Sequence, residues 1–236
     1  MLKKIKFSIK RKTLNQIYVS FLRPILEYAS SVWDGCTIYE KETLEKIQHE
    51  AARTVTGLTR SVAISKLYNE VGWLSLENRR KYQKLILTFK VKNNLTPSYL
   101  NNLFPDTVDA RGYNLRNDRN FIVPARRTEI YAKSFIPSST ALWNNLPRDI
   151  QNLDSLTLFK QAINTLYFQI PITPSFYLAG ERYYSVIHCR IRNGCSNLKH
   201  DLFTNHLSVH ERCDCGHERE NLNTSSLYEI YIMTLG

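Results

Sequence analysis

Residues 13–33 read TLNQIYVSFLRPILEYASSVW, and residues 41–57 read KETLEKIQHEAARTVTG. Apolar side chains recur in both segments every three or four residues, which is the repeat of one face of an α-helix. Gly57 stands where a helix would end in a left-handed residue. We therefore predict two amphipathic helices that are joined by residues 34–40 and pack as a hairpin. The predicted apolar face of the first helix consists of Leu14, Ile17, Tyr18, Phe21, Leu22, Ile25, Leu26, Ala29, Val32 and Trp33.

Pro24 interrupts the first of these segments. Proline removes a helical hydrogen bond and clashes with the preceding turn, so a kink or a break is predicted there. Further helices are predicted over residues 61–72, 76–92, 131–145 and 155–168. Ser75 is the candidate N-cap of the helix at 76–92, and Ser155 is that of the helix at 155–168.

The chain of 236 residues, 43% hydrophobic and 22% charged, is long and apolar enough to fold around a core. The predicted fold class is mainly α. We expect a basic arm at residues 1–12, a helical bundle at 13–170, a proline-bearing linker at 171–180 and a small helical tail domain at 181–236.

The charge balance is basic, with 32 Lys and Arg against 21 Asp and Glu and a net charge of +11. Such an excess favours a polyanionic partner, nucleic acid before an anionic membrane, while ordinary solubility charge is the plainer explanation. Residues 161–180 carry no charge, but Gln161, Asn164, Gln169 and two prolines argue against a membrane span.

Residues 1–12 hold six basic side chains and no acid. They are Lys3, Lys4, Lys6, Lys10, Arg11 and Lys12. Such an arm gains affinity for nucleic acid by releasing counterions from phosphates, and it also fits a nuclear-import signal. A frayed, solvated terminus is the alternative. The alternation of Ile5, Phe7 and Ile9 with polar residues also fits a short strand.

The predicted helix at 76–92 has a second basic surface. Leu76, Tyr82, Leu85, Ile86 and Phe89 define its inward face. The opposite face carries Arg79, Arg80, Lys81, Lys84 and Lys90. A cationic stripe of this kind suits a phosphate backbone, although any solvated helix face looks similar.

Cysteine usage indicates a reducing compartment. The five cysteines are unevenly spread and do not form a disulfide framework. The basic start of the chain has no apolar segment typical of a secretory signal. We therefore expect an intracellular protein, nuclear or cytoplasmic.

The tail contains a partial Cys/His motif. Cys213 and Cys215 are a close pair beside Gly216, but a structural zinc site needs four ligands, usually in two pairs, and no second motif follows. The expectation is an incomplete knuckle and no cofactor, with zinc as the weaker alternative.

Catalytic motifs of the common enzyme classes are absent from the sequence, including phosphate-binding glycine loops and metalloprotease signatures. Asp34, Asp149 and Asp154 stand at predicted helix ends, where capping and turn roles explain them. We therefore do not predict an enzyme.

Several segments together resemble the region that follows the catalytic palm in reverse transcriptases of non-LTR, jockey-like retrotransposons. They are residues 14–57, 67–94, 134–163, 189–203 and 213–216, and they include the phrases RPILEYASSVW, LSLENRRKY and ALWNNLP. The resemblance covers nearly the whole chain in order. It implies a helical thumb and connector that handle an RNA template and nascent DNA.

The resemblance implies nucleic-acid handling for Arg23, Arg53, Arg79, Arg80 and the basic arm as a class. The family's polymerase centre contains an Asp-Asp turn, and this sequence has no Asp-Asp dipeptide. The expectation is a truncated fragment without polymerase activity that binds RNA or an RNA–DNA hybrid. A helical module that binds a protein partner, such as the parent polymerase, and a relic without function are the alternatives. Loss of the palm also predicts that some of Tyr18, Phe21, Leu22 and Trp33 are exposed or covered only by the arm.

Overall fold

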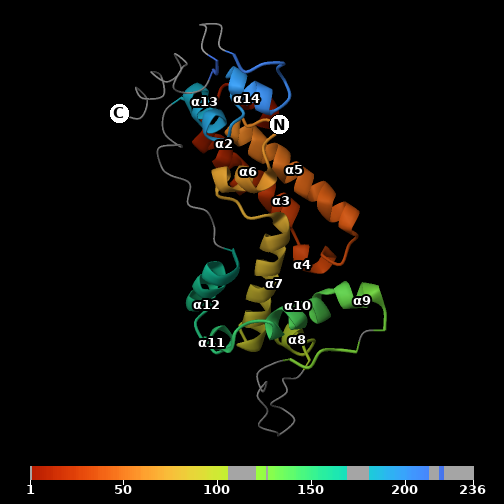
Figure 1. Ribbon diagram of the computed structural model, residues 1–236. Coiled ribbons are helices and arrows are strands. Elements are labelled where there is room, and N and C mark those ends of the chain that lie inside the picture. Colours follow the sequence, from red (N-terminus) through yellow and green to blue (C-terminus); the bar gives the residue numbers. More distant parts are fainter. Residues whose placement is uncertain (1, 106–120, 126, 169–180, 213–217, 221–236) are drawn as a thin grey trace. The chain divides into compact units, whose positions relative to one another are not determined.

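The computed structural model describes residues 2–105, 121–125, 127–168, 181–212 and 218–220, and these are mainly helical, which confirms the predicted fold class (Figure 1). The α-helices before residue 106 are α1 (Leu2–Ile5), α2 (Arg11–Ile17), α3 (Arg23–Glu27), α4 (Ser30–Trp33), α5 (Ile38–Thr56), α6 (Ile64–Val71), α7 (Leu76–Lys92) and α8 (Ser98–Asn101). Those after it are α9 (Glu129–Lys133), α10 (Phe135–Asn144), α11 (Arg148–Gln151), α12 (Leu156–Ile163), α13 (Arg182–Arg192) and α14 (Lys199–Thr204). Two π-helical segments are η1 (Tyr18–Leu22) and η3 (Asn164–Phe168).

The chain forms two compact units, each described by itself below. Unit 1 comprises the described residues of Met1–Pro24, Lys46–Trp73 and Pro171–Gly236, and unit 2 those of Ile25–Glu45 and Leu74–Ile170. This division differs from the predicted one, because the arm and the described part of the tail belong to the same unit as α6. The predicted linker at 171–180 lies outside the described residues.

The perturbation predicted at Pro24 takes the form of a π turn in the residues before it. The N–H of Arg23 bonds to the carbonyl of Tyr18, five residues back. Widening of this turn accommodates the ring and the missing N–H of proline. The backbone breaks later, at Ala29, whose φ is 50°.

The apolar face predicted for residues 13–33 is only partly buried. Leu14 and Tyr18 are fully buried in unit 1, as predicted. Phe21, Ile25 and Val32 are exposed, so their inward placement was wrong. Some of Tyr18, Phe21, Leu22 and Trp33 were expected to be exposed, and of these four Phe21 is exposed, Leu22 and Trp33 are partly buried and Tyr18 is fully buried.

Most of the predicted helix ends and N-caps are present in the structure. Gly57 and Gly72 end α5 and α6 with φ of 76° and 66°, in the left-handed region. The Ser75 side chain accepts a hydrogen bond from the N–H of Asn78, which confirms it as the N-cap of α7. Ser155 occupies the N-cap position of α12 but makes no capping bond.

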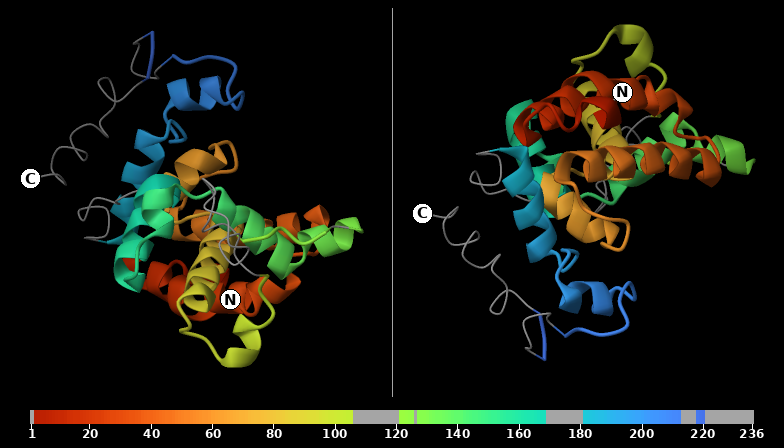
Figure 2. Two further views of the ribbon diagram at one scale, coloured as in Figure 1. Left: turned by 90° about the horizontal axis from the view of Figure 1, so that it is seen from below. Right: turned by 90° about the horizontal axis from the view of Figure 1, so that it is seen from above.

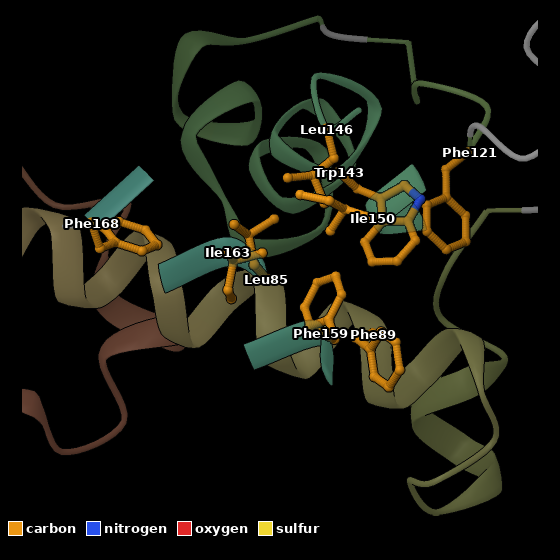
Figure 3. Packing of buried hydrophobic residues seen from close by; sticks show 9 residues of the cluster. All are labelled: Leu85, Phe89, Phe121, Trp143, Leu146, Ile150, Phe159, Ile163 and Phe168. Atoms are coloured by element: carbon orange, nitrogen blue, oxygen red, sulfur yellow. The ribbon is translucent and has the colours of Figure 1, made fainter. Parts of the chain in front are cut away.

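The core of unit 2 forms between α7, α10 and α12. The ring of Phe89 on α7 stacks on that of Phe159 at a centroid distance of 4.4 Å, and Trp143 stacks on the same ring at 5.8 Å (Figure 3). The inward placement predicted for Leu76, Leu85 and Phe89 is confirmed. Trp143, Phe159 and Ile163 are buried in the same core, whereas Leu158 and Leu166 are exposed.

The start of the chain is helical rather than extended. α1 is followed by a turn over residues 6–8, so the strand suggested by Ile5, Phe7 and Ile9 does not form. Among the described residues, no helix is both long enough and apolar enough to cross a membrane.

Candidate nucleic-acid interface

Unit 1 contains a cavity of about 790 Å³ whose wall is strongly basic. Residues 3–7, the end of α5, the loop after it and α13 contribute to the wall. The basic side chains that line it are Lys3, Lys6, Arg53, Arg60, Arg182 and Arg190. Glu50 is the only carboxylate in the described wall, so the cavity has a large excess of positive charge.

Glu50 pairs with three of these basic groups at once. Its carboxylate oxygens lie 2.8 Å from Lys3 Nζ, 3.3 Å from Arg60 Nη2 and 3.7 Å from Arg53 Nη1. The hydrogen bond from Lys3 and the nearby positive charges hold the pKa of Glu50 below its ordinary value. Glu50 is therefore ionised at neutral pH and shows that an anionic oxygen is stabilised here.

Two arginines of α13 bind the C-terminal end of α5. Arg182 donates to the carbonyls of Val55 at 3.1 Å and Thr54 at 2.5 Å, and Arg190 Nε donates to the carbonyl of Gly57 at 2.9 Å. The last carbonyls of a helix lack intrahelical partners and carry the negative end of its dipole, so guanidinium groups satisfy them well. Figures 1 and 2 show α13 beside this end of α5.

Gly57 makes this close approach sterically feasible. A Cβ atom at Gly57 would lie 2.6 Å from the side chain of Val186 on α13. The positive φ of Gly57 also disfavours any other residue. One glycine therefore both ends α5 and admits α13.

Glu70 on α6 fastens the other end of α13. Its carboxylate accepts hydrogen bonds from Arg192, Asn193 and the Cys189 thiol, and it lies 3.7 Å from the buried Arg11 guanidinium. Burial would raise the pKa of Glu70, but the bonds from Arg192 and Asn193 and the charge of Arg192 outweigh it and lower the pKa. Burial, together with the charge of Glu70, raises the pKa of Cys189, so this residue is a thiol rather than a nucleophilic thiolate at neutral pH.

Two exposed aromatic rings complete the cavity wall. Phe7 is 83% exposed and Tyr183 is 69% exposed. Lys6 Nζ lies 4.6 Å from the centroid of the Phe7 ring, which is a cation–π distance. The site thus presents both charged donors and exposed aromatic rings.

The predicted arm residues are divided between this cavity and other surroundings. Lys3 and Lys6 line the cavity, and Lys4, Lys10 and Lys12 are exposed outside its wall. Arg11 is buried and donates to the backbone carbonyl of Glu70 at 2.6 Å. Its guanidinium therefore has a structural role in unit 1.

The basic stripe predicted on α7 is not a solvated surface. Arg80 and Lys84 are each 3% exposed, and both bind Asp34. Their placement on an outer face was wrong, because α4 packs on this side of α7 and brings Asp34 with it. Figure 1 shows the two helices side by side.

The remaining predicted basic residues lie outside the cavity, apart from Arg53. Arg79 pairs with Glu27, and the half-exposed Lys81 pairs with Glu77 one turn earlier on α7. Arg23 is partly buried at the start of α3. Arg53 is the one member of this group that lines the cavity.

Arg60, Arg182 and Arg190 line the cavity but were not predicted from the sequence. A signal for the last two was present, because residues 182, 186 and 190 recur at intervals of four and therefore share one helix face. No comparable pattern marks Arg60, which the fold brings to Glu50 from the loop after α5.

Within the described part of the chain, no group of three or more His, Cys, Asp or Glu side chains is arranged to hold a metal ion. Cys213 and Cys215 lie outside the described residues, so the zinc prediction stays a prediction.

Comparison of the chain with protein-family models, with curated proteins and with solved structures gave no match.

Proposed function

We propose that this protein binds nucleic acid through the basic cavity of unit 1, as a fragment derived from a non-LTR retrotransposon reverse transcriptase that has no polymerase activity of its own. The observation that carries the proposal is the wall of the cavity, where six basic side chains accompany a single carboxylate. A site of this charge binds phosphates and releases their counterions.

Two further features support nucleic acid over other polyanions. Exposed rings of Phe7 and Tyr183 stand among the basic groups, and bases stack on such rings while phosphates meet Lys and Arg. The net charge of +11 favours encounter with any polyanion. The family resemblance suggests RNA or an RNA–DNA hybrid as the partner.

The test compares the loss of RNA affinity when two basic side chains are removed from the cavity with the loss when two are removed elsewhere in unit 1. The variant Lys6→Ala/Arg60→Ala should weaken binding of a fluorescent RNA oligonucleotide about 10-fold or more at low salt, because two phosphate contacts are lost. Fluorescence anisotropy measures the affinity.

The matched control is Lys46→Ala/Lys66→Ala, which removes two exposed lysines of the same unit that do not line the cavity. The proposal expects a change of less than about twofold for this control, because distant surface charges are screened. Equal losses in the two variants would contradict a localised site, and absence of binding by the wild-type protein would contradict the function.

A protein-interaction module is the second candidate, and one observation favours it. Unit 2 exposes several large apolar side chains from neighbouring segments. They are Ile25, Tyr28, Val32, Ile38 and Tyr39. Exposed apolar patches often mark protein–protein contacts. Sedimentation measures self-association of the protein. Self-association that persists at high salt and is lost in the variant Ile25→Ser/Val32→Ser would favour this candidate. A protein that is monomeric at every salt concentration would count against self-association.

A further inference from the structure

We infer that the basic cavity of unit 1 is selective for single-stranded nucleic acid, whose bases stack on Phe7 and Tyr183 while neighbouring phosphates bind Lys3 and Arg60. This inference rests on the proposed function and narrows its ligand class. It selects single strands over duplexes and over an RNA–DNA hybrid.

The basic groups of the cavity differ in how many hydrogen bonds and ion pairs they already make within the protein. Arg182 and Arg190 are tied to the carbonyls of Thr54, Val55 and Gly57. Lys3 and Arg60 instead have side chains that are 67% and 82% exposed, and they share the carboxylate of Glu50. These two can turn toward a phosphate at small cost, because neither is bound to backbone carbonyls as Arg182 and Arg190 are.

The rings of Phe7 and Tyr183 are not packed into the core of unit 1. Folding normally buries a phenylalanine, because removal of its ring from water is favourable. Phe7 is nevertheless 83% exposed, and Tyr183, which lines the same cavity, is exposed as well. A ring held open among basic side chains is the arrangement that binds an unpaired base.

A duplex would not use these rings. In a double helix the base faces are covered by their neighbours, so only the backbone and the groove edges are available to a protein. In a single strand every base has a free face. The cavity volume of about 790 Å³ is also in the range of small-molecule sites rather than of an extended duplex surface.

The test separates ring stacking from charge. Phe7→Leu and Tyr183→Leu remove the ring but keep an apolar side chain, and both positions are exposed, so folding is retained. Each should weaken single-stranded RNA binding by about fivefold or more, since one stacked base is lost. Tyr183→Phe keeps the ring and should restore affinity, and Tyr39→Leu, an equally exposed tyrosine in unit 2, should have no effect.

Three probes are compared by anisotropy or competition: single-stranded RNA, the same sequence as an RNA–DNA hybrid, and inorganic polyphosphate. The inference expects the tightest binding for the single strand, and expects the two leucine variants to bind hybrid and polyphosphate as the wild type does. Unchanged single-strand affinity in both leucine variants, or hybrid binding equal to single-strand binding, would overturn the inference while leaving the proposed function intact. Failure of the wild type to bind any probe would overturn both.

Discussion

Asp34 is the residue on which the buried charge of unit 2 depends. Its carboxylate lies 2.7 Å from Arg80 Nε and 2.5 Å from Lys84 Nζ, and Lys84 also donates to the Ser138 hydroxyl at 2.9 Å. The Arg80 guanidinium also lies 5.7 Å from the Trp33 ring centroid. Two buried cations therefore share one anion, and neither would tolerate its loss.

Replacing Asp34 by Asn should be strongly destabilising. The variant leaves the charges of Arg80 and Lys84 buried without a counterion, so we expect a loss of about 3 kcal/mol or more in the free energy of unfolding. Urea denaturation measures it. Glu77→Gln, which breaks the exposed pair with Lys81, is the control and should cost less than about 0.5 kcal/mol. A small effect for both variants would show that the network is not stabilising.

The same site predicts a pH dependence. Burial would raise the pKa of Asp34, but the hydrogen bond and charge of Lys84, with the charge of Lys41, outweigh it, so the pKa is below the ordinary 3.8. A lowered carboxyl pKa contributes stability above the ordinary value that is lost as pH falls through the folded-state pKa. The stability difference between wild type and Asp34→Asn should thus be constant near neutral pH and shrink below about pH 4. A difference that grows with acid would contradict this assignment.

At the scale of elements, the placement of α13 against α5 is the feature that builds the site. It depends on Gly57, where both the positive φ and the contact with Val186 exclude a side chain. Gly194 has a similar φ of 65°, but a Cβ there would meet only Asp201, at 4.0 Å. A side chain at Gly194 would meet backbone strain alone, whereas one at Gly57 would meet both strain and a steric clash, so a comparison of the two positions distinguishes the two effects.

Gly57→Ala should cost about 3 kcal/mol, from roughly 1–2 kcal/mol of backbone strain plus roughly 1–3 kcal/mol for displacing α13. Gly194→Ala should cost only the backbone strain, roughly 1–2 kcal/mol. Urea denaturation of both variants measures the difference, and Gly57→Ala should also weaken RNA binding. Equal costs at the two positions would show that α13 does not pack tightly on the end of α5.

The helices themselves were largely predictable, because each one is specified by local signals. Periodic apolar residues predicted α5, α6, α7 and α12, and glycines marked the ends of α5 and α6. The outward face of α7 was not predictable, since burial of Arg80 and Lys84 depends on Asp34, about fifty residues earlier in the chain. Periodicity shows which residues share a face, but the rest of the fold decides which face is covered.

At the scale of the whole molecule, the candidate site draws on segments that are distant in sequence. The cavity wall includes Lys3, Glu50, Arg60 and Arg182, from all three segments of unit 1. The arm was correctly singled out as basic, but its convergence with α13 depends on long-range packing. Composition therefore predicts the type of residue in the wall, but three of its six basic side chains, Arg60, Arg182 and Arg190, were not predicted.

A folded protein of this kind should unfold cooperatively. The contacts within each unit depend on one another, as in the stacked rings of unit 2 and the bonds that hold α13 in unit 1. A sigmoidal thermal transition is therefore expected by circular dichroism. A relic sequence that no longer specifies a fold would lose its signal gradually. A gradual loss would therefore contradict the structure described above.

The salt dependence of RNA binding tests the central claim most directly. The affinity of the wild-type protein for single-stranded RNA, measured by anisotropy between about 50 and 200 mM salt, should fall linearly on logarithmic axes. Two to four phosphate contacts in the cavity predict a slope between about −1.4 and −2.8, since each contributes roughly −0.7, and Lys6→Ala/Arg60→Ala should make it shallower by about 1.4. A slope near zero, or one unchanged by this variant, would contradict nucleic-acid binding at the cavity.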